Sequence, residues 1–329
     1  MLKIGIIGAG HLGKIHISIL KRMECFDLVG FYDSDPQVVK EVKEEFKIFA
    51  FNNSADLISA SDAICIVTPT DSHYDYAVAG LKNSKHLFIE KPLAFNIDEA
   101  QNLVKLANEA YVKVQVGHVE RFNPAFNASK SYINNPMFIE AHRLSPFNPR
   151  GTEVPVVLDL MIHDIDIALS TVKSNIKKIY ASGVAVLSNT PDIANARLEF
   201  DNGCVANLTA SRISVVKMRK CRFFQNDAYV SIDFLNKTSD IIRLNNENTI
   251  SSNDHKIIDL YRSENDTKQI LIEKPEIIQY NAIEEELFSF YKSITENTSP
   301  IVTIQDGFNA LSVAFNILEK LRTVSNHSS

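Results

Sequence analysis

The chain is poor in cysteine, with only Cys25, Cys65, Cys204 and Cys221 among its 329 residues, and no two of them form a Cys-x-x-Cys pair. Scattered cysteines of this kind are typical of reduced thiols, and they argue against a disulfide framework or a cysteine-based metal site. We therefore expect a cytoplasmic protein.

Long hydrophobic runs and basic blocks are also missing. No stretch approaches the roughly 18 uninterrupted apolar residues of a membrane-spanning helix. The opening MLKIGIIGAG is too short for a signal peptide and leads into a glycine turn instead of a cleavage site. Lys and Arg do not cluster, and the net charge is −6, which argues against a broad nucleic-acid-binding surface. We expect neither membrane nor nucleic acid among the partners.

A glycine motif stands near the N-terminus, where LKIGIIGAGHLG joins a short apolar run to a helical pattern. Gly8, Gly10 and Gly13 have the G-x-G-x-x-G spacing, with a predicted strand before them and a predicted helix after them. In this setting the glycines allow a tight turn, close approach of a pyrophosphate and close helix–strand packing. His11 and Leu12 lie inside the motif, at the helix N-terminus, where backbone N–H groups bind phosphates. The motif predicts a dinucleotide site.

An acidic residue follows at the expected distance, because the next predicted strand ends at Asp33, 20 residues after Gly13. An acid at this place binds a ribose 2′-hydroxyl. No Lys or Arg follows until Lys40, so a 2′-phosphate would face Asp33 and Asp35 without a neutralising cation. The sequence therefore predicts NAD rather than NADP. The alternative is that Asp33 only caps the helix that Asp35-Pro36 begins.

Strands and helices alternate up to about His118, which indicates a doubly wound parallel sheet, the Rossmann arrangement. The predicted strands include 62–69 and 86–90, with a helix from about Ser72 and another that Asn96 and Glu99 open as a capping box. Ligands of such sheets bind beyond the carboxyl ends of the strands. These ends carry Asp33, Thr68-Pro69, Glu90-Lys91-Pro92 and Gly117-His118. His73 lies nearby, either on the cofactor or as a helix cap.

The pattern changes after Pro124, where alternating and β-branched segments follow one another. The segment ARLEFDNGCVANLTA is typical of a hairpin with an Asn-Gly turn. The sequence thus predicts an α/β protein with a Rossmann domain over 1–122. An α+β domain with a mostly antiparallel open sheet follows over 123–329, for substrate binding and oligomerisation. A helix over about 303–323, with Thr303 and Asp306 at its start, is expected to pack back on the first domain.

One apolar segment, VVLDLMIHDIDIAL (156–169), carries four polar residues. A helix turns by about 100° per residue, which brings Asp159, His163 and Asp166 within about 60° of one another. A helix that is apolar almost all round is buried. We therefore expect a buried helix with a polar seam, and Asp164 pointing elsewhere as a solvated or capping charge.

These motifs together resemble the Gfo/Idh/MocA oxidoreductases, named for glucose–fructose oxidoreductase and inositol dehydrogenase. The matching segments are GIIGAGHLGKIH, TPTDSHYDYAVAGLKNSKHLFIEKPLA, VGHVERFNP and LDLMIHDIDIAL. The resemblance implies that Lys91 lies near the nicotinamide, that Glu90 helps to hold the cofactor and that the Lys91–Pro92 bond is cis. It maps the family's Asp-x-x-x-His pair to Asp159 and His163. The family's glycine-rich lead into that helix is absent, because this chain has FNPRGTEVPVV.

The implied chemistry is oxidation of an alcohol by NAD, in which the protein supplies geometry, a base and charge stabilisation. His163 suits the base because its ordinary pKa is near 6.5. Asp159 can orient the ring, and Lys91 can stabilise the alkoxide or itself relay the proton. A purely structural Asp–His pair is the alternative. A metal on Asp159, His163 and His118 is conceivable, but this chemistry requires none, so we expect no metal.

The expected substrate is sugar-like, with a nucleotide sugar as one candidate, since the resembling family acts mainly on sugars, cyclitols, sugar nucleotides and related alcohols. Two arginines, Arg143 and Arg150, can clamp a phosphate or carboxylate, or they are solvated arginines of a rigid proline-punctuated loop. Arg121 and Asn123 either bind substrate or fix the domain junction, and Asp166 either contacts the substrate or forms a structural ion pair. The resemblance also implies a homodimer or homotetramer. The competing hypothesis is a catalytically silent NAD-binding sensor or partner protein on the same fold.

Overall fold

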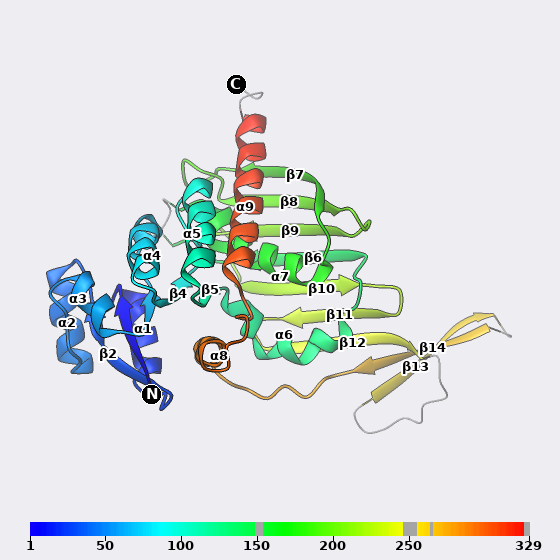
Figure 1. Cartoon of the computed structure of the whole chain (residues 1–329). Helices are drawn as coiled ribbons and strands as arrows, with labels where there is room; N and C mark the ends of the chain where they lie inside the picture. Colours follow the sequence, from blue (N-terminus) through cyan, green and yellow to red (C-terminus); the bar gives the residue numbers. More distant parts are fainter. Residues whose placement is uncertain (149–153, 246–254, 264–265, 326–329) are drawn as a thin grey trace. The chain divides into compact units, whose positions relative to one another are not determined.

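A computed structural model describes residues 1–148, 154–245, 255–263 and 266–325 of the chain (Figure 1). The chain folds into two compact units. The first comprises residues 1–122 and 280–312, and the second comprises residues 123–279 and the segment from residue 313 onward. None of the described helices combines the length and the hydropathy that a membrane span needs.

The first unit is built on a five-stranded parallel sheet in the order β2-β1-β3-β4-β5, which confirms the predicted Rossmann arrangement. Its inner strands are mostly apolar runs, and most of their residues are buried, as expected of parallel strands between helices. The elements in chain order are β1 (Leu2–Ile7), α1 (His11–Leu20), β2 (Phe26–Tyr32), α2 (Pro36–Phe46), α3 (Ser54–Ala60), β3 (Ala63–Ile66), η1 (Thr70–Ser72), α4 (His73–Lys82), β4 (His86–Glu90), α5 (Ile97–Ala110), β5 (Val114–Gly117), η2 (Val119–Phe122) and α8 (Ala282–Thr295).

Local capping sets where the helices of the first unit begin. The Asn96 side chain accepts a hydrogen bond from the Glu99 amide and opens α5, as predicted. Asp35 caps α2 ahead of Pro36. The helix expected from about Ser72 begins at His73, after the short 3₁₀ turn η1. Helix α8, from the C-terminal part of the chain, packs its Leu287 and Phe290 into the core beside α1.

The second unit holds a nine-stranded sheet in the order β13-β14-β12-β11-β10-β6-β9-β8-β7. The sheet is antiparallel except for the β6–β9 pair, which confirms a mostly antiparallel sheet. The predicted hairpin is β8 and β9, and Gly203 in its turn has a φ of 85°. The elements are α6 (Pro124–Ser129), η3 (Lys130–Tyr132), β6 (Phe138–Leu144), η4 (Val157–Met161), α7 (Ile162–Val172), β7 (Ile176–Val184), β8 (Ile193–Phe200), β9 (Val205–Ser211), β10 (Met218–Phe224), β11 (Ala228–Asp233), β12 (Thr238–Asn245), β13 (His255–Ser263) and β14 (Asp266–Glu273).

Helices α6 and α7 cover one face of this sheet (Figure 1). The strands alternate buried and part-exposed residues, so a single face of the sheet packs on these helices. In β6 the buried positions are Ile139, Ala141 and Arg143, which places an arginine on the inner face.

The last helix, α9 (Ile304–Ser325), begins in the first unit and ends in the second. Thr303 and Asp306 exchange hydrogen bonds between side chain and backbone at its start. Gly307 lies directly against Val116 of β5, and a Cβ at Gly307 would approach that side chain to 2.7 Å. The start of α9 is therefore packed on the edge strand of the parallel sheet.

Candidate functional site

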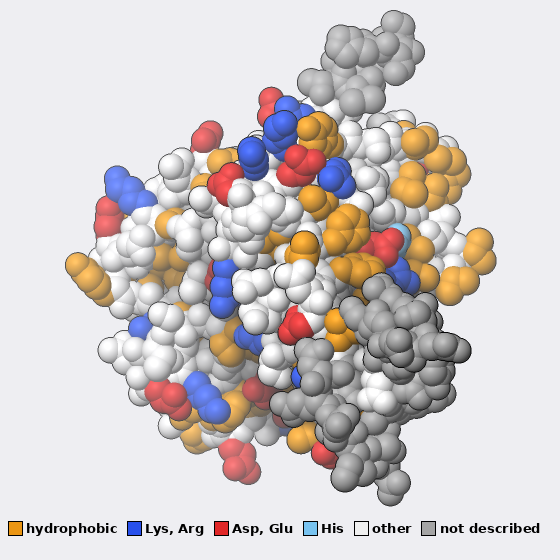
Figure 2. Space-filling model, turned by 90° about the vertical axis from the view of Figure 1, so that its right-hand side faces the viewer, with side chains coloured by type: hydrophobic (Ala, Val, Ile, Leu, Met, Phe, Trp, Pro, Cys, Tyr) orange, Lys and Arg blue, Asp and Glu red, His pale blue; other side chains and the backbone are white. Residues whose placement is uncertain are grey.

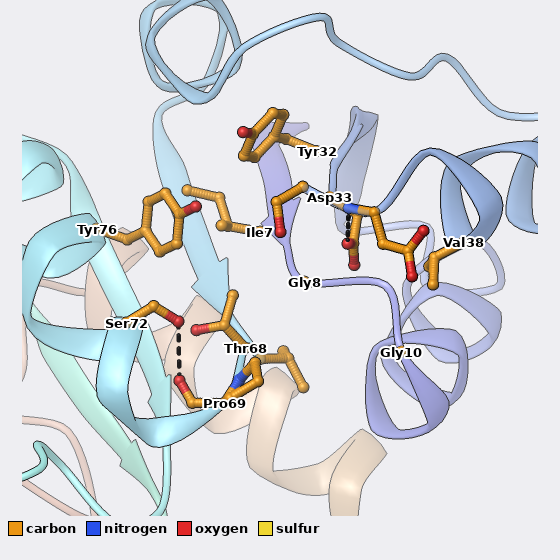
Figure 3. Close-up of a pocket in the computed structure, with 13 residues that line it drawn as sticks. Ile7, Gly8, Gly10, Tyr32, Asp33, Val38, Thr68, Pro69, Ser72 and Tyr76 are labelled. Carbon is orange, nitrogen blue, oxygen red and sulfur yellow. Dashed lines mark hydrogen bonds between the residues drawn. The ribbon is translucent and has the colours of Figure 1, made fainter.

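A pocket of about 370 Å³ opens at the carboxyl ends of β1, β2 and β3 (Figure 3). The glycine loop, the end of β2 and the turn after β3 form its walls, as the predicted crevice requires. The lining residues are Ile7, Gly8, Gly10, Tyr32, Asp33, Ser34, Asp35, Val38, Val67, Thr68, Pro69, Ser72 and Tyr76.

The glycine loop has the geometry that a pyrophosphate needs. Gly8 has a φ of 93°, and a Cβ there would lie 2.6 Å from the Val67 carbonyl oxygen. A Cβ at Gly10 would meet nothing within 4 Å, so the backbone at Gly10 borders open space in the pocket. A Cβ at Gly13 would lie 2.2 Å from the Gly8 carbonyl oxygen, which shows why the first turn of α1 needs a glycine at this position. Helix α1 has no side-chain cap and no acid in its first turn, so its amides suit an anion.

Asp33 is tied to the glycine loop. Its Oδ2 accepts a hydrogen bond of 2.7 Å from the Ala9 amide, and its Oδ1 accepts one of 2.9 Å from the Asp35 amide. Because Asp35 itself caps α2, the alternative that Asp33 is the helix cap is wrong. The carboxylate keeps lone pairs for ribose hydroxyls. No Lys or Arg occurs among the described residues that line the pocket.

Two tyrosines that the sequence reasoning missed form another wall of the pocket (Figure 3). The rings of Tyr32 and Tyr76 meet edge to face with centroids 6.3 Å apart. Burial raises the pKa of the Tyr76 hydroxyl, and Tyr32 with the carboxylates of Asp33 and Asp75 raises it further. The sequence held one signal for this wall, because Tyr32 directly precedes Asp33.

The turn after β3 brings Thr68 and Pro69 to the pocket, as predicted. The Thr68 Oγ1 atom is buried and has no hydrogen-bond partner among the described residues, so it fits a polar group of a bound cofactor. His73 does not line the pocket. Its ring is only 1% exposed, and both ring nitrogens contact backbone carbonyls. Its expected direct contact with the cofactor is therefore wrong, and so is the alternative of a cap.

The Glu90-Lys91-Pro92 turn follows β4 at the same edge of the sheet, and its Lys91–Pro92 bond is cis. Glu90 is buried, with Oε1 located 2.9 Å from Nε2 of His16 and Oε2 accepting a 3.2 Å bond from the Lys91 amide. Gly117 on β5 makes room for this carboxylate, because a Cβ there would lie 2.9 Å from Oε2. Lys91 is half-buried.

The segment predicted as one regular helix begins instead with a π-helical turn, η4, that carries Asp159 and continues as α7 with His163. Such turns are frequent at functional sites. Asp159 is exposed and His163 is half-buried. A π-helical turn does not rotate by the about 100° per residue of an α-helix. The predicted alignment of Asp159 with His163 and Asp166 along one seam therefore does not hold across this turn. Asp166 is buried, at 1% exposure.

Asp164 was expected to be solvated, and the structure corrects this. It is 4% exposed, and its two oxygens accept hydrogen bonds of 2.9 and 3.1 Å from Arg143 on the inner face of β6. A buried charge needs such a partner. Because the Arg143 guanidinium is committed to this pair, its expected role as an anion clamp is also wrong. The alternation of buried and part-exposed residues along β6 was the signal in the sequence that Arg143 points inward.

The remaining substrate candidates are Arg121, Asn123 and Arg150. Arg121 lies 3.8 Å from Asp306 in an ion pair. Asn123 caps α6 through the Ala125 amide and donates to the Phe234 carbonyl, so its expected substrate contact gives way to a structural role. Arg150 lies outside the described residues. Within the described ranges, no group of three or more His, Cys, Asp or Glu residues is arranged to hold a metal ion.

Known proteins resemble this chain over its full length. Residues 2–118 match "Oxidoreductase family, NAD-binding Rossmann fold", and residues 135–229 match "GFO/IDH/MocA C-terminal domain". UDP-N-acetylglucosamine 3-dehydrogenase of Acidithiobacillus ferrooxidans is 37% identical over 238 residues, which cover 72% of this chain and 75% of that protein. Myo-inositol 2-dehydrogenase of Thermotoga maritima is 24% identical over 345 residues, which cover 98% of each chain.

Solved structures extend the resemblance to the fold. A crystal structure of the Acidithiobacillus ferrooxidans UDP-N-acetylglucosamine 3-dehydrogenase superposes with a TM-score of 0.87 at 29% identity, over 98% of both chains. The fold is also shared with scyllo-inositol dehydrogenase of Lactobacillus casei, solved with NAD(H) and scyllo-inositol. That structure has a TM-score of 0.78 at 21% identity and covers 98% of this chain and 97% of its own.

Proposed function

Because the chain belongs to the Gfo/Idh/MocA oxidoreductase family, we propose that it oxidises a ring hydroxyl of a nucleotide sugar with NAD. The predicted family, enzyme class and NAD cofactor are confirmed by these matches. The proposal rests on the edge of the parallel sheet where its strands end. Gly10, Asp33 and Thr68, which line the pocket, each follow one strand there, and the turn that carries Lys91 follows the neighbouring strand β4.

The nucleotide sugar is supported by the relative that acts, by its name, on UDP-N-acetylglucosamine and that resembles this chain at 37% identity. UDP-N-acetylglucosamine is therefore the first substrate to test, with carbon 3 as the expected position of oxidation. The inositol dehydrogenases are less similar to this chain, at 24% identity for the Thermotoga maritima enzyme. Cyclitols are therefore the second substrate class to test.

Different residues would bind the cofactor and handle the proton of the substrate hydroxyl. When bound, NAD supplies the hydride acceptor. The glycine loop would hold its pyrophosphate, Asp33 its ribose, and the Thr68 turn and Glu90 its nicotinamide half. Lys91 would stabilise the developing alkoxide as an ammonium group or relay its proton. His163, oriented by Asp159, is the other candidate for the proton, on the strength of the Asp-x-x-x-His motif.

The test is a panel of UDP-sugars, free sugars and inositols, offered with NAD and with NADP, and read by the absorbance of the reduced cofactor. We expect turnover with UDP-N-acetylglucosamine and NAD. Turnover with inositols alone would replace the nucleotide sugar by a cyclitol. A protein that binds NADH but reduces no cofactor with any member of the panel would be a sensor and not a dehydrogenase.

We also propose that the outer face of the nine-stranded sheet is a subunit interface of a homodimer or homotetramer. Outward-facing Phe138, Phe224 and Tyr229 form an aromatic row across β6, β10 and β11, with centroid distances of 5.9 and 4.9 Å. Figure 2 views the molecule from the side at the right of Figure 1 and shows hydrophobic side chains among charged ones there. Light scattering of wild type and Phe224→Ser tests this proposal, and a monomeric wild type would contradict it.

A further inference from the structure

His73 opens α4, and its ring lies between two turns of the first unit. Nδ1 is 2.9 Å from the Pro92 carbonyl oxygen, and Nε2 is 2.9 Å from the Thr68 carbonyl oxygen. The turn at Thr68 follows β3 and lines the pocket, whereas the turn at Pro92 follows β4 and carries Lys91. One buried side chain therefore joins the two turns.

Both partners of this ring are hydrogen-bond acceptors, since a carbonyl oxygen carries no proton. A neutral imidazole has one N–H and donates to one of them, and only the imidazolium donates to both. Burial outweighs the two carbonyls and the carboxylates of Glu90 and Asp71, so the pKa of His73 is lowered, and the neutral ring donates to one carbonyl and contacts the other through its second nitrogen. An ordinary neutral core histidine pairs its N–H with an acceptor and its other nitrogen with a donor. The second carbonyl is what separates this residue from that simpler role.

We propose that His73 is a positioning residue that couples the cofactor-binding turn at Thr68 to the turn that carries Lys91. The proposal rests on the role given above to Lys91. The backbone around Lys91 is then held on both sides, because the Lys91 amide donates to Glu90 and the Pro92 carbonyl oxygen lies 2.9 Å from Nδ1 of His73. Movement of the Thr68 turn when the cofactor binds is transmitted to Lys91 through the ring.

Two amide variants can separate the two contacts. In His73→Asn the side-chain nitrogen stands near the place of Nδ1 and keeps the bond to Pro92. In His73→Gln it stands near the place of Nε2 and keeps the bond to Thr68. A purely structural histidine predicts similar defects in both variants, whereas a coupling residue predicts opposite ones.

We expect His73→Asn to weaken NADH affinity about fivefold to tenfold with less than a twofold fall in kcat, as for loss of one net hydrogen bond. His73→Gln should instead keep the NADH affinity and lower kcat about fivefold to tenfold. His86→Asn is the matched control, because His86 lies at the opposite end of β4, where its Nδ1 accepts from the Lys113 amide. This control should change the melting temperature without changing kcat or NADH affinity.

NADH affinity is measured by fluorescence and kcat with the substrate found in the panel. The acetylation rate of Lys91 by acetic anhydride, read by mass spectrometry, adds a readout that needs no turnover. His73→Gln should change this rate at least twofold, and His73→Asn should not. If both variants lower affinity, kcat and melting temperature in parallel, or if neither changes any of them, the coupling is wrong. If no panel member reacts while affinity and acetylation still separate the variants, the proposed function fails and the coupling stands.

Discussion

The Nε2 atom of His16 lies 2.9 Å from Oε1 of Glu90, and both side chains are buried in the first unit. The other ring nitrogen, Nδ1, faces the Sγ atom of Cys65 at 3.6 Å. Burial raises the pKa of the Cys65 thiol well above its ordinary value, and the carboxylates of Glu90 and Glu286 raise it further. The thiol therefore keeps its proton and donates a hydrogen bond to Nδ1, and the N–H of Nε2 donates to the Glu90 carboxylate, which can only accept. This chain of bonds links helix α1 to the backbone of Lys91.

Glu90→Gln should break this chain, because an NH2 group replaces one of the two oxygens that face His16 and the Lys91 amide, and this group cannot accept a hydrogen bond. We expect the free energy of unfolding to fall by about 1–3 kcal/mol, the cost of a buried group left unsatisfied. Urea unfolding measures it, with Glu44→Gln on the exposed face of α2 as the control. A variant as stable as the control would show that the bonds to Glu90 contribute nothing.

Lys91→Ala and His163→Ala should each lower kcat by about 10²- to 10³-fold, the scale of lost charge stabilisation or acid–base catalysis. NADH affinity should change little, because neither side chain holds the adenosine half of the cofactor. The pH dependence of kcat/KM in each variant identifies the proton acceptor. Lys105→Ala, an exposed lysine of α5, is the control. Wild-type rates in both variants would remove these residues from the mechanism.

Asp33→Ser should weaken NAD binding about tenfold to hundredfold, because hydrogen bonds to a charged acceptor contribute about 1.5–3 kcal/mol. It should also narrow the preference for NAD over NADP, since a repelling carboxylate is removed from the ribose 2′ position. Calorimetric titration with both cofactors measures the change. Asp27→Asn serves as the control, because Asp27 is an exposed residue of β2, the strand that Asp33 follows. An unchanged preference would contradict the role of Asp33.

Asp164→Asn should destabilise the second unit by about 3–5 kcal/mol, because it leaves the buried Arg143 guanidinium without its charge partner. The half-exposed pair of Arg222 and Glu140 provides the comparison, since Glu140→Gln should cost less than about 1 kcal/mol. Urea unfolding distinguishes the two. Equal losses would mean that burial of the Arg143 pair has no energetic consequence.

Asp192 makes the stability of the second unit depend on pH. Burial alone would raise its pKa, but hydrogen bonds from residues 186–188 outweigh it and hold the pKa well below the ordinary value. A carboxyl with a lowered folded-state pKa stabilises the fold above its unfolded pKa, and this contribution is lost as the pH falls below about 5. Unfolding between neutral and acid pH should therefore show a steeper loss in the wild type than in Asp192→Asn. Parallel pH curves would contradict this.

Much of the first unit could be predicted because its signals are local. The spacing of Gly8, Gly10 and Gly13 and the distance to Asp33 follow from backbone demands within one strand–turn–helix segment. The hairpin of β8 and β9 follows from its turn and its alternation in the same way. The pairs that the predictions missed join distant segments, as Arg143 and Asp164 do. Nothing local in the sequence of Asp164 distinguishes a solvated carboxylate from a buried one.

The sequence by itself determined the family, the cofactor and the order of strands and helices, because these depend on short motifs and on periodicity. Only the tertiary structure decided what each polar side chain contacts. It turned Arg143 inward toward Asp164, assigned Asn123 to a helix cap, and placed the His73 ring between the carbonyls of Thr68 and Pro92. The physical reason is that most buried polar groups must find a partner, and the identity of that partner depends on which strands and helices pack together.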